Sequence, residues 1–104
     1  MSQPPALTPE QRRAALEKAA AARQQRAEVK DRLKQGHLTL GALFALADAD
    51  ETVGKLKVLS MLESLPGVGK VRARRVLDEV GISESRRLRG LGAHQRARLL
   101  ERFA

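Results

Sequence analysis

The segment Leu62–Ala73 contains the feature that most limits how this chain folds, a tight turn at Leu65–Lys70 of sequence Leu-Pro-Gly-Val-Gly-Lys. Proline ends a helix, while glycine allows a sharp turn and a close approach of the backbone to a neighbouring group. The apolar Val68 has room between the flanking segments, and the small Ala73 allows the second segment to lie close to the first. The pattern therefore predicts two short helices joined by a tight turn.

This turn has the chemistry of a phosphate-binding site. The first turn of a helix presents unpaired amide groups and the positive end of the helix dipole, and both attract anions. Lys70 and Arg72 add positive charge at the same place. A site of this kind holds phosphate oxygens rather than base edges, so we expect it to have no sequence preference. The segment resembles the helix-hairpin-helix signature of nucleic-acid-binding proteins.

The turn has two other possible interpretations. A nucleotide-binding P-loop requires glycine, four residues, then Gly-Lys and a serine or threonine. Here Gly69-Lys70 fits, but Ser64 stands at the first glycine position and Val71 at the last, and no strand is predicted before the turn. The second alternative is a tight turn between packed helices that binds no ligand. The mismatched residues argue against a P-loop, and the dense positive charge around the turn favours phosphate binding over a turn without a ligand.

A second glycine-rich basic segment follows at Gly81–Gly92. It carries three arginines within four positions, and Leu88 and Leu91 are expected to anchor it to the core while the arginines point outward. Arginine binds phosphate in a bidentate manner, and glycine allows the backbone to approach closely. Gly92 also opens the last predicted helix. The alternative is a solvated basic loop, and the combination of arginines with glycines favours DNA contact.

The overall charge points to a polyanionic partner. Twenty Lys and Arg residues against twelve Asp and Glu residues give a formal net charge of +8. The excess lies at both ends: residues 1–35 carry a net +4, residues 36–65 a net −2 and residues 66–104 a net +6. Such a field favours nucleic acid. With only two aromatic residues, stacking on single strands is disfavoured, and the duplex is the expected partner.

The composition also excludes several classes of protein. The chain has no cysteine and only two histidines, far apart in sequence, so we expect neither a disulfide nor a metal site, and no cofactor. No apolar run is long enough to span a membrane, and the N-terminus lacks the pattern of a signal peptide. We therefore expect a cytoplasmic, non-enzymatic protein with no membrane partner and no small-molecule substrate.

Residues 8–36 predict one long basic helix. Thr8 and Gln11 form a capping box, Pro9 occupies the first helical position, and Gly36 ends the helix. The apolar face consists mainly of alanine, so only the C-terminal part is expected to pack on the core, through Val29 and Leu33. The N-terminal half is expected to project or to lie across the rest.

The remaining sequence predicts short helices and no strand. The expected helices are 40–47, 51–54, 57–64, 68–80 and 93–103, the first two capped by Thr39 and Asp50 and the fourth ended by Gly81. The predicted organisation is all-α, with a flexible N-terminus at 1–7, a long helix at 8–36 and a small domain at 37–104.

The two glycine-rich segments together resemble the actinobacterial integration host factor. The matching stretches are 62–73 and 81–92, and the start of the long helix at Leu7–Arg12 fits as well. The resemblance implies a nucleoid-associated protein with a long N-terminal helix and a helix-two-turns-helix domain. It also implies little sequence preference, a change in the shape of duplex DNA, organisation of the chromosome and assistance to phage integrases in site-specific recombination. We expect the protein to be monomeric in solution.

Carried over to this chain, the resemblance places the DNA surface on the turn, the basic residues after it and the second basic segment. The predicted DNA-binding residues are Pro66, Gly67, Val68, Gly69, Lys70, Arg72, Arg74, Ser85, Arg86, Arg87, Arg89, Gly90, Leu91 and Gly92. Additional candidates on the long helix are Arg12, Arg13, Arg23 and Arg26, for which a solvated helix face is the alternative.

Two alternatives for the function stay open at this point. A small-subunit ribosomal protein uses a similar hairpin on ribosomal RNA, although that protein usually has a long basic tail and this chain ends at Phe103-Ala104. A protein-interaction module would use the long helix as its partner surface, but it would leave the two basic glycine segments without a role.

Overall fold

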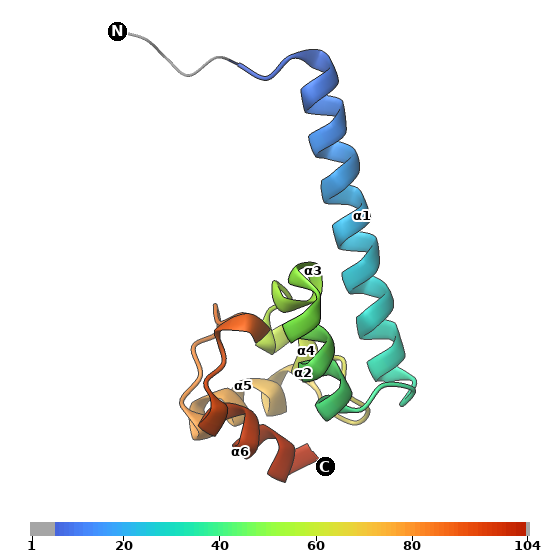
Figure 1. The fold of residues 1–104 in the computed structure, drawn as a ribbon. Helices are drawn as coiled ribbons and strands as arrows, with labels where there is room; N and C mark the ends of the chain where they lie inside the picture. The colour runs from blue at the N-terminus through green and yellow to red at the C-terminus, as the bar shows by residue number, and fades with distance from the viewer. Residues whose placement is uncertain (1–5, 104) are drawn as a thin grey trace, which may run out of the picture.

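The structure, a computed structural model, describes residues 6–103, in which all regular elements are helices and no strand forms. The elements are α1 (Pro9–Lys34), α2 (Leu40–Ala49), α3 (Glu51–Gly54), α4 (Val58–Glu63), α5 (Lys70–Val80), a 3-10 turn η1 (Leu88–Gly90) and α6 (Ala93–Phe103). The predicted all-α class, with a long first helix and a small helical domain, is confirmed (Figure 1). Of the predicted flexible N-terminus, residues 1–5 lie outside the described part of the chain.

The ends of α1 follow the predicted capping rules. The Gln11 amide donates to Thr8 Oγ1 at 3.1 Å, and the Thr8 amide donates to Gln11 Oε1 at 2.9 Å. At the other end, Gly36 has a φ of 75°, and the amide of His37 reaches back to the carbonyl of Arg32. This pair of contacts stops the helix at a residue that tolerates left-handed backbone.

Only the C-terminal part of α1 belongs to the packed domain. Val29 and Leu33 are buried, as predicted, whereas every residue from 9 to 21 is exposed. In Figure 1, α1 runs past α3 and its N-terminal half extends beyond the body of the domain. The N-terminal half therefore projects, because alanines offer too little apolar surface to hold it down.

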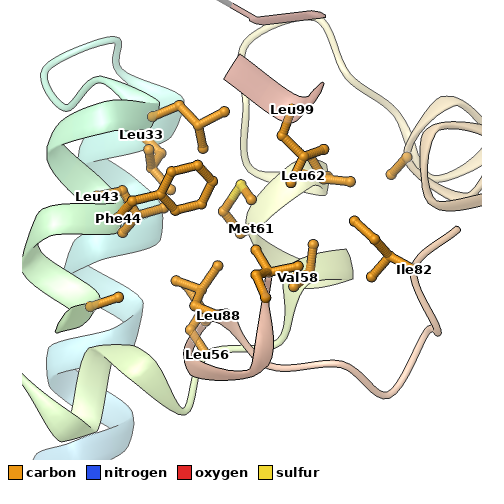
Figure 2. Packing of buried hydrophobic residues seen from close by; sticks show 14 of the residues in the cluster. Leu33, Leu43, Phe44, Leu56, Val58, Met61, Leu62, Ile82, Leu88 and Leu99 are labelled. Atoms are coloured by element: carbon orange, nitrogen blue, oxygen red, sulfur yellow. The ribbon is translucent and has the colours of Figure 1, made fainter. Parts of the chain in front are cut away.

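The core is formed where the short helices converge beneath α1 and α2. Figure 2 shows Leu33, Leu43 and Phe44 facing Met61 from α4, with Leu99 and Leu88 closing the cluster. Met61, Leu62, Leu88 and Leu99 are all fully enclosed. The hairpin helices are shorter than predicted, since α4 begins at Val58 and α5 only at Lys70. Val68 instead packs within the turn, 8% exposed.

An ion pair ties α6 to α2 beside this core. Arg96 donates from Nη1 to Asp48 Oδ2 at 2.9 Å and from Nη2 to Oδ1 at 2.8 Å, while its guanidinium lies 5.2 Å from the centre of the Phe44 ring. Bidentate geometry of this kind is among the stronger charge-assisted contacts. The hydrogen bonds from Arg96 lower the pKa of Asp48 below its ordinary value.

We expect the stability contributed by the Asp48–Arg96 ion pair to be lost in acid. A carboxyl whose pKa is depressed in the folded state contributes stability above its ordinary pKa of 3.8, and this contribution is lost as the pH falls through the depressed value. Asp48→Asn should therefore lower the melting temperature at neutral pH. The difference in melting temperature between variant and wild type should shrink as the pH falls from 3.8 through the depressed pKa of Asp48. Thermal unfolding followed by circular dichroism measures this gap. Asp78→Asn on α5 controls for loss of one charge, and an Asp48→Asn gap that is constant with pH would contradict the assignment.

Candidate nucleic-acid interface

The hairpin turn, Leu65–Lys70, is a well-formed and accessible loop. The Val68 amide donates to the Leu65 carbonyl at 3.1 Å, and the buried Val68 side chain holds the turn against the core. Gly67 has a φ of 75°, and Gly67, Gly69 and Lys70 are all exposed. Because the Val68 side chain is buried, only its backbone is available to a ligand.

The two glycines of the turn have different roles. Gly67 adopts left-handed backbone, which side chains disfavour. Gly69 has a φ of −90°, which any residue adopts, and a Cβ built on it meets no atom within 4 Å. The conformation therefore needs glycine at Gly67, whereas at Gly69 the missing side chain leaves open space in front of the turn.

The start of α5 is open to an anion. Its N-cap is Gly69, which has no side chain to cap the first amides, so they face solvent beside Lys70. Side chains cap α1, α2 and α3, whereas α4 also lacks a side-chain cap but its first amide, that of Val58, donates to the Arg86 carbonyl. Uncapped amides at an exposed helix start are suited to hold phosphate oxygens.

Two of the predicted DNA contacts on α5 have partners within the protein. The Arg72 guanidinium lies 5.9 Å from the centre of the Phe103 ring, and Arg74 Nε lies 3.2 Å from Glu84 Oε1. Both arginines are exposed, so these contacts orient them without withdrawing them from solvent.

The basic segment Ser83–Gly92, which we call the Arg loop, is pinned to the domain by a short antiparallel bridge. The Val58 amide donates to the Arg86 carbonyl, and the Leu88 amide donates to the Leu56 carbonyl, both at 2.9 Å. Leu88 and Leu91 are buried, as predicted. The loop is therefore ordered by backbone pairing as well as by its leucines.

This pairing sends the three arginines in different directions. Arg86 is half-buried, and its Nη1 donates to the Gly90 carbonyl at 2.7 Å, so the prediction that all three arginines point outward is wrong for Arg86. Arg87 is exposed and lies next to Lys57 across the bridge. Arg89 packs over Gly54, where an added Cβ would lie 3.3 Å from the Cβ of Arg89. The loop thus exposes Arg87 and Arg89 to solvent, while the Arg86 side chain bonds back to the backbone of the loop.

The remaining predicted residues of the Arg loop are shaped by internal contacts. A Cβ on Gly90 would lie 3.0 Å from Arg86 Cδ, so Gly90 makes room for that arginine rather than for a ligand. The Leu91 side chain is buried, and Ser85 bonds to Ser83. The Gly92 amide donates to Gln95 Oε1, a contact that sequence reasoning missed. Gln95 also donates to the Gly81 carbonyl, which ties α6 to the end of α5.

The hairpin turn and the Arg loop lie at opposite ends of α5. The turn precedes Lys70, and the Arg loop follows Gly81, with an 11-residue helix between them. Such a helix is about 16 Å long. The structure therefore separates the two predicted DNA-binding segments into distinct patches.

A third basic surface, which sequence analysis did not recognise as a unit, lies between α1 and the body. We call it the α1 groove. It has a volume of about 360 Å³ and is lined by Arg23, Arg26, Ala27, Lys30, Lys55, Leu56, Lys57, Ser60 and Arg87. The α1 members follow the i, i+3, i+4, i+7 spacing of a single helix face. That spacing was readable in the sequence, but the partners from 55–60 and 87 were not.

A polar contact next to the groove fixes α1 against the start of α3. Gln25 Nε2 donates to Asp50 Oδ2, while Asp50 Oδ1 accepts the amides of Thr52 at 2.9 Å and Val53 at 3.4 Å. Gln25, Val29 and Leu33 form the packed face of α1, next to the basic face. This packing places Arg23 and Arg26 along the groove, whereas Arg12 and Arg13 lie on the projecting half, away from the other candidates.

Between residues 6 and 103, no cluster of three or more His, Cys, Asp or Glu side chains is arranged to hold a metal ion. Over the same residues, no helix has the length and apolar character needed to cross a membrane.

Comparison with known proteins gives consistent results. The S13-like H2TH domain family matches residues 33–103. The chain is 58% identical to the integration host factor of Streptomyces coelicolor over 95% of this chain and 92% of that protein, and 58% identical to the integration host factor of Mycobacterium tuberculosis over 95% and 94%. A solved structure, sIHF bound to an 8 bp palindromic DNA, superposes with a TM-score of 0.83 at 53% identity, covering 85% of this chain and 99% of that chain.

The contrast between the two glycines yields a prediction. Gly67→Ala should destabilise the fold by about 1–2 kcal/mol, because alanine is strained in left-handed backbone. Gly69→Ala, the matched control, should cost clearly less, because its φ is ordinary, its Cβ meets open space, and the lower entropy of the unfolded alanine chain opposes the preference of an N-cap for glycine over alanine. Urea unfolding of the two variants measures the difference. Equal destabilisation by both variants would contradict the distinct roles assigned here.

Proposed function

The chain belongs to the family of integration host factors built on an S13-like H2TH (helix-two-turns-helix) domain, and we propose that it binds duplex DNA through the phosphate backbone as a nucleoid-associated protein. The observation that carries this proposal is the 53% identical structural neighbour, which was solved bound to DNA. This chain retains the same fold and presents an exposed, uncapped helix start at its hairpin turn.

The contacts that would hold DNA are electrostatic and lie on the backbone of the duplex. Lys70 and the open amides at the start of α5 form one patch, and Arg87 with Arg89 forms the other. The first patch consists of backbone amides and a lysine, groups that hold phosphate oxygens rather than base edges, which supports binding with little sequence preference.

We extend the proposal to the shape of the bound DNA. A duplex that contacts both patches must follow the length of α5, and its path between them determines whether it bends. A protein of this kind would assist a phage integrase by shaping its DNA substrate, without performing chemistry itself. We also propose that it acts as a monomer in the nucleoid.

The proposal is tested by measuring the binding of two unrelated labelled duplexes at several salt concentrations. Fluorescence anisotropy of the label reports the binding. With about six phosphate contacts, the logarithm of the binding constant should fall against the logarithm of salt with a slope near −5, about 0.9 per contact. The variant Lys70→Ala/Arg87→Ala/Arg89→Ala should weaken binding to both duplexes to the same degree. The magnitude of the slope should fall by about 3.

The control variant is Arg32→Ala/Lys34→Ala/Arg98→Ala, which removes the same charge from exposed positions outside both patches. It should change the slope by less than about 0.9, the value expected for one phosphate contact. Affinity that does not depend on salt, or a loss confined to one duplex, would contradict backbone binding. Competition by single-stranded DNA and structured RNA completes the test, since a preference for structured RNA would support the ribosomal-type alternative.

A further inference from the structure

The α1 groove lies outside the two DNA-binding patches proposed above, except for Arg87, although the sequence also predicts Arg23 and Arg26 in its lining as additional DNA-binding candidates. Six of its nine lining residues are cations, and they come from three separate segments: α1, residues 55–57 and the Arg loop. No carboxylate lines the groove. Glu51 neutralises part of this charge from outside, through an ion pair with Lys55 at 3.5 Å.

Such a concentration of like charge is unfavourable without an anion. Cations gathered in a concave surface repel one another more strongly than they would on a flat, fully solvated face. In this fold they are nevertheless held together, because the bridge fixes Lys57 beside Arg87 and Gln25 fixes α1 against α3. Arg87 Nη1 also lies 3.4 Å from the Lys55 carbonyl, which draws its guanidinium toward the groove. The site is therefore preorganised for negative charge.

The size of the groove favours a compact ligand. Its volume of about 360 Å³ lies at the lower end of the range for small-molecule sites, about 300–1,000 Å³. A duplex, by contrast, contacts proteins over broad surfaces, on the order of 1,000 Å² or more. The flexible lysines and the forked arginines together suit several closely spaced phosphate oxygens.

We propose that the α1 groove binds a compact polyphosphate, such as inorganic triphosphate or the triphosphate group of a nucleotide. The binding itself is independent of the proposed DNA function. Because Arg87 belongs to both the groove and the DNA-binding Arg loop, an occupied groove also weakens DNA binding, and this consequence rests on the proposed function. The phosphates of DNA are the other source of the same chemistry, so the experiment separates the two.

The first measurement is isothermal titration calorimetry of the full chain with inorganic triphosphate, in low-salt buffer without magnesium or DNA. We expect saturable binding at one site per chain, with inorganic phosphate binding at least roughly tenfold more weakly. Arg26→Ala/Lys57→Ala should reduce the triphosphate affinity roughly tenfold or more, since each lost charge-assisted contact is worth several-fold in affinity. Arg32→Ala/Arg98→Ala, which removes the same charge from exposed positions outside the groove, should change it less than about twofold.

The second measurement locates the site and tests competition. In nuclear magnetic resonance titrations, triphosphate should shift the amide signals of 23–30, 55–60 and 86–88, and should leave those of Gly67–Lys70 unchanged. In the anisotropy assay, triphosphate should lower duplex affinity for the wild type more than for Arg26→Ala/Lys57→Ala.

The outcomes separate this proposal from the DNA function. Absence of saturable triphosphate binding overturns it, as does an equal loss of affinity in the two paired variants, which would indicate only bulk charge. Loss of duplex affinity in Arg26→Ala/Lys57→Ala without triphosphate binding would assign the groove to the DNA backbone and also overturn it. Triphosphate binding in a chain that fails to bind duplex would uphold the groove and reject the DNA function.

Discussion

The arrangement of the Arg loop and of one wall of the α1 groove depends on two backbone hydrogen bonds between residues 56–58 and 86–88. Because the side chains alternate across this short antiparallel contact, Leu56 and Leu88 enter the core while Lys57 and Arg87 remain outside it. The pairing thus converts a glycine-rich basic loop into an ordered element. It also links the core of the domain to the α1 groove, since Arg87 reaches the groove only from this position.

The distribution of charge on the folded surface differs from its distribution along the chain. By sequence, residues 36–65 carry a net charge of −2, which disfavours an anion site. In the fold, Asp48 pairs with Arg96, Asp50 caps α3 and accepts Gln25, and Glu51 pairs with Lys55. Lys57 carries no such partner within the described residues and faces the groove together with cations from α1. Three of the four acidic side chains of this region thus serve in structural contacts, while its lysines contribute to the positive surface.

Much of the local structure followed from residue type and spacing. The capping box at Thr8, the stop at Gly36 and the caps at Thr39 and Asp50 all rest on contacts between residues close in sequence, and each is present. The bounds of the hairpin helices were less accurate, because Val68 is drawn into the core and delays the start of α5. The orientation of Arg86 was missed for a similar reason, since its partner is the Gly90 carbonyl of a loop whose shape depends on long-range pairing.

The sequence by itself determined the helical class, the turn at Leu65–Lys70, the projecting first helix and the strong positive charge, because these depend on short-range geometry and composition. Only the tertiary structure decided which cations share a surface. Arg23, Arg26 and Lys30 lie on one helix face by periodicity alone, but Lys55, Lys57 and Arg87 join them through contacts between segments distant in the chain. Electrostatic interactions act through space, so the placement of charge could not be read from its order along the sequence.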